Sequence, residues 1–290
     1  MKNTIKLILL IISVLFVYEI YSFSSIKIDD LPVITIYPEI IYTGNPIFIT
    51  INASTTPREI KFNNKNINFS KFGDKYLGII GIDFNDKNTQ YEISVKLENG
   101  MNFKEYVNIK SREKIEKPLG IPAKLGGNTK EASSMLISNL AIENAELNNI
   151  KSANKSLWTD TFEYPISNVF VTDEYGYNRK TVDQTIVHKG TDFRAIVGTP
   201  VMSINDGVVK ISKKFTVYGN TIVIDHGNGI LSLYMHLSQL SVKAGENVKS
   251  GQLVGYSGDT GYAEAPHLHI SIKINSISID PMVFMKYFKK

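Results

Sequence analysis

Three patterns of apolar and polar positions follow one another along the chain, and the first is a short apolar run. Lys2 and Lys6 precede the segment from Leu7 to Tyr18, which only Ser13 interrupts. A basic start followed by an apolar core of about 7–15 residues is typical of a secretory signal, whereas a membrane-spanning helix usually needs about 20 apolar residues. Residues 1–25 are therefore predicted to be a signal peptide, or a membrane anchor if the segment is not cleaved.

The second pattern is a series of short alternating segments over residues 26–112. Turn residues such as Gly44-Asn45-Pro46 and Asn99-Gly100 separate them. Alternation at this spacing predicts an antiparallel β-sandwich. The segment contains no histidine and no convergent catalytic motif, so a spacer or binding module is the favoured interpretation. The clearest predicted strands are Val33–Tyr37, Ile47–Ile51, Tyr91–Leu97 and Phe103–Ile109.

Residues 113–165 change character and are predicted to be a linker that contains a helix. Leu136, Leu140, Leu147 and Ile150 recur at helical spacing, which predicts an amphipathic helix from about residue 130 to residue 152. We expect this helix to pack against a domain. The alternative is that it lies over an active site as a lid.

The third pattern, over residues 166–290, is again β-rich, and its turns are rich in glycine. Gly227-Asn228-Gly229 joins Thr221–Asp225 to Ile230–His236, which predicts a hairpin with a short loop. In the second strand, alternation predicts Leu231, Leu233, Met235 and Leu237 in the core, with Ile230, Ser232, Tyr234 and His236 on the opposite face. The predicted fold class is therefore mainly β, with two β domains and a linker helix between them.

Length, charge and composition narrow the functions that this architecture can carry. A chain of 290 residues suits two domains. Its formal net charge of +4 is compatible with an anionic polymer but is too small and too dispersed to indicate nucleic-acid binding. The chain has no cysteine, so any metal must be held by histidines and carboxylates.

Candidate chemistry is confined to the third region, because all five histidines lie between positions 188 and 269. In the predicted strand Pro266–Ile272, His267 and His269 share one face, and Leu268, Ile270 and Ile272 share the other. His188 precedes Asp192 by four residues, and Gly190 between them allows the backbone to bring both side chains to one metal. A catalytic zinc typically takes three such ligands and keeps a fourth position for water.

The three segments that carry these residues resemble the motifs of the lysostaphin/LytM-type zinc metallopeptidases. They are His188-x-x-x-Asp192, Tyr234-x-His236-Leu237 and Pro266-His267-Leu268-His269, and the similarity runs from about residue 169 to residue 282. Enzymes of this family cut the peptide part of peptidoglycan.

The resemblance implies a role for each site residue. It assigns one zinc ion per chain to His188, Asp192 and His269, and it makes His236 and His267 the catalytic histidines. It also implies a compact antiparallel β domain with the metal in a groove. The sequence contains no His-Glu-x-x-His motif, so a thermolysin-like arrangement with a glutamate base is not available. His226, at a hairpin end, is interpreted as structural.

The whole chain also resembles an exported subgroup of this family with an Ig-like domain before the peptidase. Residues 26–112 would then be that Ig-like domain, and residues 166–290 the peptidase. The resemblance implies export to the periplasm or cell envelope and peptidoglycan as the polymeric substrate. It implies no nucleic-acid partner, and membrane contact only through an uncleaved N-terminal segment.

Three departures from the family pattern affect the surroundings of the site. Ser271 stands where many relatives carry Glu, Arg179 lies one place late in Tyr175-Gly176-Tyr177-Asn178-Arg179, and Ala265 replaces a common Gly. Two alternatives to an enzyme stay open: a non-catalytic protein that binds peptidoglycan or activates a hydrolase, and an adhesin-like structural protein. The bond that is cut also stays open between glycine bridges and direct cross-links of D-configured residues.

Overall fold

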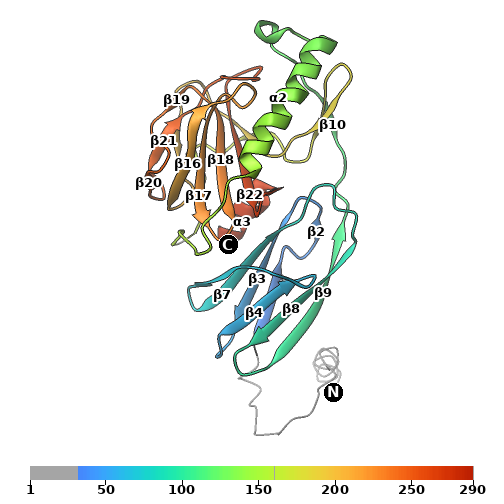
Figure 1. Ribbon diagram of the computed structural model, residues 1–290, viewed down its shortest axis with the longest axis vertical. Helices are drawn as coiled ribbons and strands as arrows, with labels where there is room; N and C mark the ends of the chain where they lie inside the picture. Colours follow the sequence, from blue (N-terminus) through green and yellow to red (C-terminus); the bar gives the residue numbers. More distant parts are fainter. Residues whose placement is uncertain (1–31, 160, 290) are drawn as a thin grey trace, which may run out of the picture.

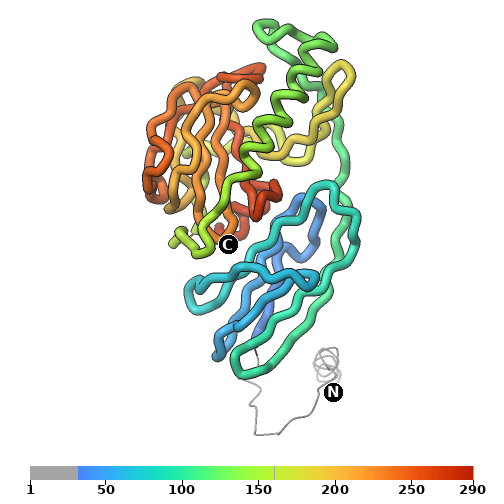
Figure 2. Tube along the Cα trace, viewed as in Figure 1, coloured from blue at the N-terminus to red at the C-terminus, as the bar shows by residue number. Residues whose placement is uncertain are grey.

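The computed structural model describes residues 32–159 and 161–289, and these form two β-rich parts with a long helix beside the second (Figure 1; Figure 2 shows the same view as a Cα trace). The predicted signal or anchor segment, residues 1–25, lies outside the described residues. In the described part of the chain, neither α-helix combines the length and apolar character that a bilayer span requires. The predicted mainly β fold class is confirmed.

The N-terminal part is a sandwich of two sheets whose strands alternate as predicted. Ile47, Ile49 and Ile51 point into the core between the sheets, where they meet Ile93 and Val95. One sheet has the order β1 (Val33–Tyr37), β3 (Pro46–Asn52), β7 (Lys75–Gly81), β6 (Phe69–Phe72). The other has the order β2 (Ile41–Tyr42), β9 (Asn102–Lys110), β8 (Gln90–Leu97), β4 (Pro57–Phe62), β5 (Lys65–Asn66).

The C-terminal part is built on one large antiparallel sheet. Its order is β11 (Val171–Asp173), β14 (Thr191–Arg194), β22 (His267–Ile274), β18 (Ile230–Leu237), β17 (Asn220–Gly227), β16 (Gly207–Lys214), β20 (Asn247–Val248), and β23 (Ile277–Ile279) pairs with β22. One small sheet joins β15 (Pro200–Met202), β21 (Leu253–Tyr256) and β19 (Gln239–Leu240), and another joins β10 (Glu116–Pro118), β12 (Asn178–Lys180) and β13 (Thr185–Val187). A 3-10 turn, η2 (Ala123–Leu125), precedes α2, and the chain ends in α3 (Pro281–Phe288).

Strand β22 shows the predicted separation of its two faces. Leu268, Ile270, Ile272 and Ile274 are fully buried in the main core of the C-terminal part. The alternate residues on the other face are polar. At about 25 cal/mol per Å² of apolar surface removed from water, full burial of each such side chain contributes roughly 1.5–3 kcal/mol, which fixes the register of the strand.

The linker helix α2 spans Lys130–Asn148 and begins at the predicted residue. Thr129 caps its N-terminus, because the Thr129 hydroxyl accepts a hydrogen bond from the backbone N–H of Ala132 at 3.1 Å. The helix ends at Asn148 rather than at the predicted Ser152. Beyond it, the Ser152 hydroxyl and the Ala153 N–H both donate to the buried Asp225 carboxylate, at 2.5 and 3.0 Å, which holds this segment in a non-helical path.

The N- and C-terminal parts share an aromatic contact. Phe48, on the outer face of β3, stacks on Tyr287 of α3 with ring centroids 3.9 Å apart. Phe48 therefore belongs to the same buried cluster as Phe284 and the rest of the C-terminal core. Asp280 caps the start of α3 and also pairs with Arg112 at 2.9 Å, so the last helix is fixed to the sandwich by packing and by charge.

Candidate active site

The structure brings the three predicted metal ligands together at the junction of β14 and β22. Asp192 lies directly opposite His269 in the strand register, and His188 comes from the turn just before β14. His188 Nε2 lies 3.0 Å from His269 Nδ1 and 3.2 Å from Asp192 Oδ1, and Asp192 Oδ1 lies 2.7 Å from His269 Nδ1. All three residues are buried, and one ligand atom of each lies within 4.8 Å of the others.

Gly190 makes this approach possible. A Cβ atom at position 190 would lie 2.3 Å from Nε2 of His269 and 2.5 Å from the carbonyl oxygen of Ile270. Since real Cβ atoms do not approach so closely, any side chain there would displace the imidazole or the strand. The absence of a side chain at Gly190 thus allows the His269 ring and strand β22 to approach the turn between His188 and Asp192.

The surrounding protein sets the orientation of both ligand histidines. The ring N–H at Nδ1 of His188 can donate to the carbonyl oxygen of Glu174 at 2.8 Å. The ring N–H at Nε2 of His269 can donate to Ser271 Oγ at 2.8 Å, and Ser271 Oγ donates in turn to the carbonyl oxygen of Lys189 at 2.8 Å. With these protons engaged, each neutral ring keeps one lone pair directed at the common point, as metal-ligating histidines require.

The third ligand, Asp192, is also held from behind. Arg179 contacts the Oδ2 atom of Asp192 and the Oδ2 atom of Asp173, the latter at 2.8 Å through Nε. The guanidinium thereby occupies one carboxylate oxygen of Asp192 and leaves Oδ1 directed at the histidines. The displaced Arg179 of the sequence motif therefore still reaches the site.

Charge and burial act in opposite directions on these ligands. Burial by itself would raise the pKa of Asp192, but the neighbouring His188 and His269 hold that pKa well below its usual range. Burial lowers the pKa of His269 to about 4, against the opposing effect of Asp192. At neutral pH the site therefore presents an ionised carboxylate and an unprotonated His269, which is the donor set that zinc binds. This buried His-Asp-His group fits one zinc ion.

The two predicted catalytic histidines lie beside the ligands. The ring centroid of His236 is 4.8 Å from that of His267 and 6.1 Å from that of His269. His236 Nδ1 contacts the carbonyl oxygen of Thr260 at 2.8 Å, and His267 Nδ1 contacts that of Ala265 at 2.8 Å. When each Nδ1 carries the donated proton, each Nε2 is a free proton acceptor.

The predicted face of His236 is wrong, because its backbone departs from the strand. Its φ is +61°, in the left-handed region that costs a non-glycine residue about 1–3 kcal/mol. Alternation breaks there: Leu237 joins Tyr234 in the main core, while His236 lines the same cavity as Leu233 and Met235. Such local strain is common at functional sites, and here it turns an imidazole out of the core toward the metal ligands.

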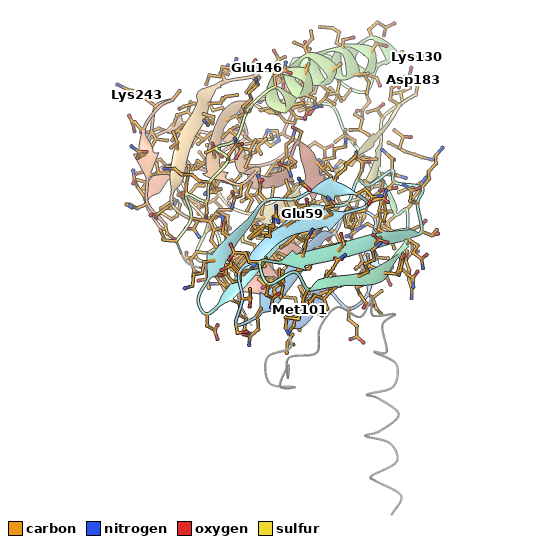
Figure 3. The ribbon with its side chains drawn as sticks, turned by 60° about the horizontal axis from the view of Figure 1, so that its bottom comes forward. Glu59, Met101, Lys130, Glu146, Asp183 and Lys243 are labelled. Carbon is orange, nitrogen blue, oxygen red and sulfur yellow. The ribbon has the colours of Figure 1, made fainter. Side chains whose placement is uncertain are left out.

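A cavity of about 350 Å³ adjoins the site. His188, His236 and His269 line it from the sheet, and Leu136 and Leu140 of α2 line it from the opposite side. The helix crosses beside β18 and β22 in Figure 1, and Figure 3 shows Lys130, at its start, close to Asp183 of the β12–β13 loop. The helix is therefore packed on the domain, as predicted, and also forms a wall of the active-site cavity.

A buried carboxylate fastens α2 to this wall. Glu143 accepts hydrogen bonds from three consecutive backbone N–H groups, those of Thr216, Val217 and Tyr218, at 2.7, 2.9 and 3.1 Å. Tyr218 also donates from its hydroxyl to Asn144 at 2.9 Å. Because the loop at 216–218 borders the cavity, these bonds fix the distance between the helix and the groove.

The fifth histidine, His226, lies outside the cavity lining. It is fully buried and contacts the carbonyl oxygen of Asp206 at 2.7 Å and Ser232 Oγ at 2.8 Å. Its ring packs edge-on against Phe162, with centroids 5.4 Å apart. Both ring nitrogens are thus satisfied within the core, in agreement with the structural role expected for it.

Sequence reasoning missed several groups that complete the site. The carbonyl oxygens of Glu174 and Thr260 belong to the backbone, and no side-chain pattern announces them. Asp173 and Glu143 look like ordinary surface charges in the sequence. A signal was available for Glu143, since it falls on the apolar face that Leu136, Leu140 and Leu147 define.

The sheet, the buried His-Asp-His group and the two adjacent histidines define a β domain built to hold one zinc ion beside a groove. Comparison with known proteins agrees. Residues 186–281 match the family described as Peptidase family M23, and the chain therefore contains a domain of that family.

Two curated relatives cover this domain. Over 95 residues the chain is 42% identical to the peptidoglycan DD-endopeptidase ShyA of Vibrio cholerae. The aligned segment covers 33% of this chain and 22% of that protein. Over 106 residues the chain is 46% identical to the glycyl-glycine endopeptidase ALE-1 of Staphylococcus capitis. This aligned segment covers 34% of this chain and 29% of that protein. The matched segment thus spans less than a third of either relative.

Among the similar solved structures is one that matches 84% of the chain. A putative peptidase M23 from Pseudomonas aeruginosa superposes with a TM-score of 0.56 at 22% identity, over 84% of this chain and 94% of that one. At this identity the match shows that the two chains share a fold.

Proposed function

We propose that this protein is an exported zinc metalloendopeptidase that hydrolyses peptide cross-links or stem peptides of bacterial peptidoglycan. One observation carries the proposal: three buried ligand atoms converge within 4.8 Å, and the imidazoles of His236 and His267 lie beside them, His236 also lining a cavity. The similarity to endopeptidases, one of them a peptidoglycan DD-endopeptidase, supports peptidoglycan as the substrate.

In this proposal His188, Asp192 and His269 hold the zinc. When bound, zinc supplies a Lewis acid for the scissile carbonyl and lowers the pKa of water from 15.7 to about 7. Arg179, Ser271 and the carbonyl oxygen of Glu174 keep the three ligands in the orientation that binding requires.

In the same proposal His236 transfers the proton of the attacking water, and His267 interacts with the oxyanion. Burial, followed by the charges of His267 and His269, lowers the pKa of His236 to about 3, so its Nε2 is unprotonated at neutral pH. A positioned imidazole with a free Nε2 can accept the proton of the attacking water and return it to the leaving amine. His267, with Nε2 3.7 Å from Asp192 Oδ1, lies beside the ligands, where its ring can interact with the developing oxyanion.

The direct test is metal analysis together with clearing of purified peptidoglycan. We expect about one zinc per chain and clearing that stops when a chelator removes the metal and returns when zinc is restored. A protein that binds zinc and adheres to peptidoglycan without releasing peptides would instead support the non-catalytic alternative.

Export is the second part of the proposal, and it is supported by Lys2, Lys6 and the apolar run from Leu7 to Tyr18. Cell fractionation is expected to place the protein outside the cytoplasmic membrane, released or tethered. Recovery of the bulk of the protein from the cytoplasm with Met1 intact would contradict export and leave the enzymatic proposal standing.

A further inference from the structure

The active-site cavity has an unbalanced charge. Its lining includes the basic residues Arg179, Lys189 and Lys273 and contains no aspartate or glutamate among the described residues. Arg179 is neutralised from behind by Asp173 and Asp192. The two lysines therefore make the lining of the cavity basic.

Lys273 is the more unusual of the two, because it is buried. Only 5% of its surface is exposed, and its Nζ donates to the Asn148 side-chain oxygen at 2.6 Å. An ammonium group has three protons to donate, and within the described chain no ion pair joins this one to a carboxylate. Burial of a charge without a counter-charge is costly, so the position calls for a functional explanation.

The location of Lys273 supplies that explanation. It lies on the same face of β22 as His269, four residues further along, which places it roughly 13 Å from the metal ligand at about 3.3 Å per residue. His269, Ser271 and Lys273 all line the same cavity. An extended peptide cut at the metal would bring a group three or four residues away to this ammonium.

Resting on the function proposed above, we propose that Lys273 binds a carboxylate of the substrate, so that the enzyme prefers acidic peptide cross-links over neutral glycine bridges. The nearby Lys189 strengthens the potential at the same end of the cavity. Burial, and then Lys189, lowers the pKa of Lys273 to about 8, and a bound carboxylate would favour the charged form further.

The cavity also suits the rest of such a substrate. At about 350 Å³ it lies at the lower end of the range for ligand sites, enough for a short peptide segment. Leu147 of α2 and Leu233 and Met235 of β18 provide an apolar surface between Lys273 and the histidines. A peptide with small aliphatic side chains and a terminal or side-chain carboxylate matches this order of apolar and basic groups.

The experiment compares soluble substrates on the zinc-loaded full chain. The first is a peptide dimer with a direct cross-link and free carboxylates, the second is the same dimer with those carboxylates amidated, and the third has a pentaglycine bridge. A charge-assisted hydrogen bond contributes about 1.5–3 kcal/mol. The acidic dimer should therefore be cleaved with a kcat/KM about 10- to 100-fold higher than the amidated dimer.

Variants separate binding of substrate from anchoring of α2. Lys273→Met should bring the ratio of the two kcat/KM values close to one, and Lys273→Arg should keep the preference. Asn148→Ala removes the bond to α2 but leaves the cation, and Lys213→Met removes an exposed lysine that pairs with Glu146. Both controls should keep the wild-type ratio.

The outcomes are distinct from those of the proposed function. Equal cleavage of the acidic and amidated dimers, or a preference that survives Lys273→Met, would overturn the carboxylate site and leave a peptidase. If no substrate is cleaved, calorimetric titration of the zinc-loaded protein with both dimers decides. Tighter binding of the acidic dimer, lost in Lys273→Met, supports the carboxylate site even without hydrolysis, and equal binding overturns it.

Discussion

The two faces of β22 are both largely buried, but one belongs to the core and the other to the active site. On one face Leu268, Ile270 and Ile272 lie in the main core with no exposed surface. On the other, His269 and Ser271 are 7% and 5% exposed, yet both line a cavity. Burial alone therefore does not separate core from active site. The difference is that the polar atoms of His269 and Ser271 have hydrogen-bond partners that fix their direction.

The largest effects are expected from single alanine substitutions of the five residues at the metal site. Removing a ligand leaves the tetrahedral preference of zinc half unsatisfied, so His269→Ala, His188→Ala and Asp192→Ala should lose both metal and activity. His267→Ala and His236→Ala should keep about one zinc per chain and lose activity by roughly 10²–10⁴-fold. Metal analysis and a turbidity assay on purified variants measure both quantities.

Two outcomes would contradict this division into metal ligands and catalytic histidines. If His267→Ala emerges without zinc while His269→Ala retains it, the roles of the two histidines are reversed. If all five variants stay active, the zinc peptidase proposal is wrong.

The apolar face should respond in the opposite way. Ile272→Ala removes a fully buried side chain that points away from the metal, so we expect a loss of about 2–5 kcal/mol in the free energy of unfolding. The folded fraction should still bind one zinc per chain, as urea denaturation followed by metal analysis would show. A variant of unchanged stability that had lost its metal would contradict the division of the strand into two functions.

His226 tests the comparison from the core side, where it is a polar group among apolar neighbours. Burial lowers its pKa to about 4, below the 6.5 expected in the unfolded chain. The unfolded state therefore binds more protons between pH 6.5 and pH 4, and stability falls as the pH is lowered through that window. The contribution of this residue is on the order of 3 kcal/mol across the window.

Denaturation of the wild type and of His226→Gln at several pH values isolates this effect. The variant keeps polar atoms at the site but cannot titrate, so its stability should depend less steeply on pH between 6.5 and 4. An identical slope for both proteins would show that His226 is not held neutral by the core.

The smallest expected effect is that of Ser271, which touches a ligand but not the metal. Ser271→Ala leaves the Nε2 proton of His269 without its acceptor, and loss of such a partner typically costs 10- to 100-fold in metal affinity. Competition with a chelator measures this directly, and Ser271→Thr should restore most of the affinity. Zinc affinity equal to that of the wild type in Ser271→Ala would mean that the ligand is oriented by packing alone.

Much of this arrangement was predictable, because it depends on local periodicity. Alternation along residues 266–272 placed His267 and His269 opposite a core face, and helical spacing located the start of α2. The mainly β class follows from the same patterns. These are properties of single elements and their immediate neighbours in the sequence.

The groups that could not be predicted depend on contacts between distant elements. The left-handed conformation of His236 is imposed by its surroundings, since nothing in Tyr234-Met235-His236 favours a positive φ. Glu143 reaches a loop more than 70 residues away, and its three N–H partners carry no side-chain signature. The metal site was thus predictable from its ligands, and its supporting groups were not.

The stack of Phe48 on Tyr287 has a consequence for the order in which the chain is made. Synthesis proceeds from the N-terminus, so β3 is complete long before α3, the last of the described elements. Until then the outer face of β3 and β7, with Phe48, Leu77 and Ile79, has no C-terminal core to cover it. Exposed apolar strands of this kind favour aggregation. Completion of α3 therefore allows this apolar face to be covered.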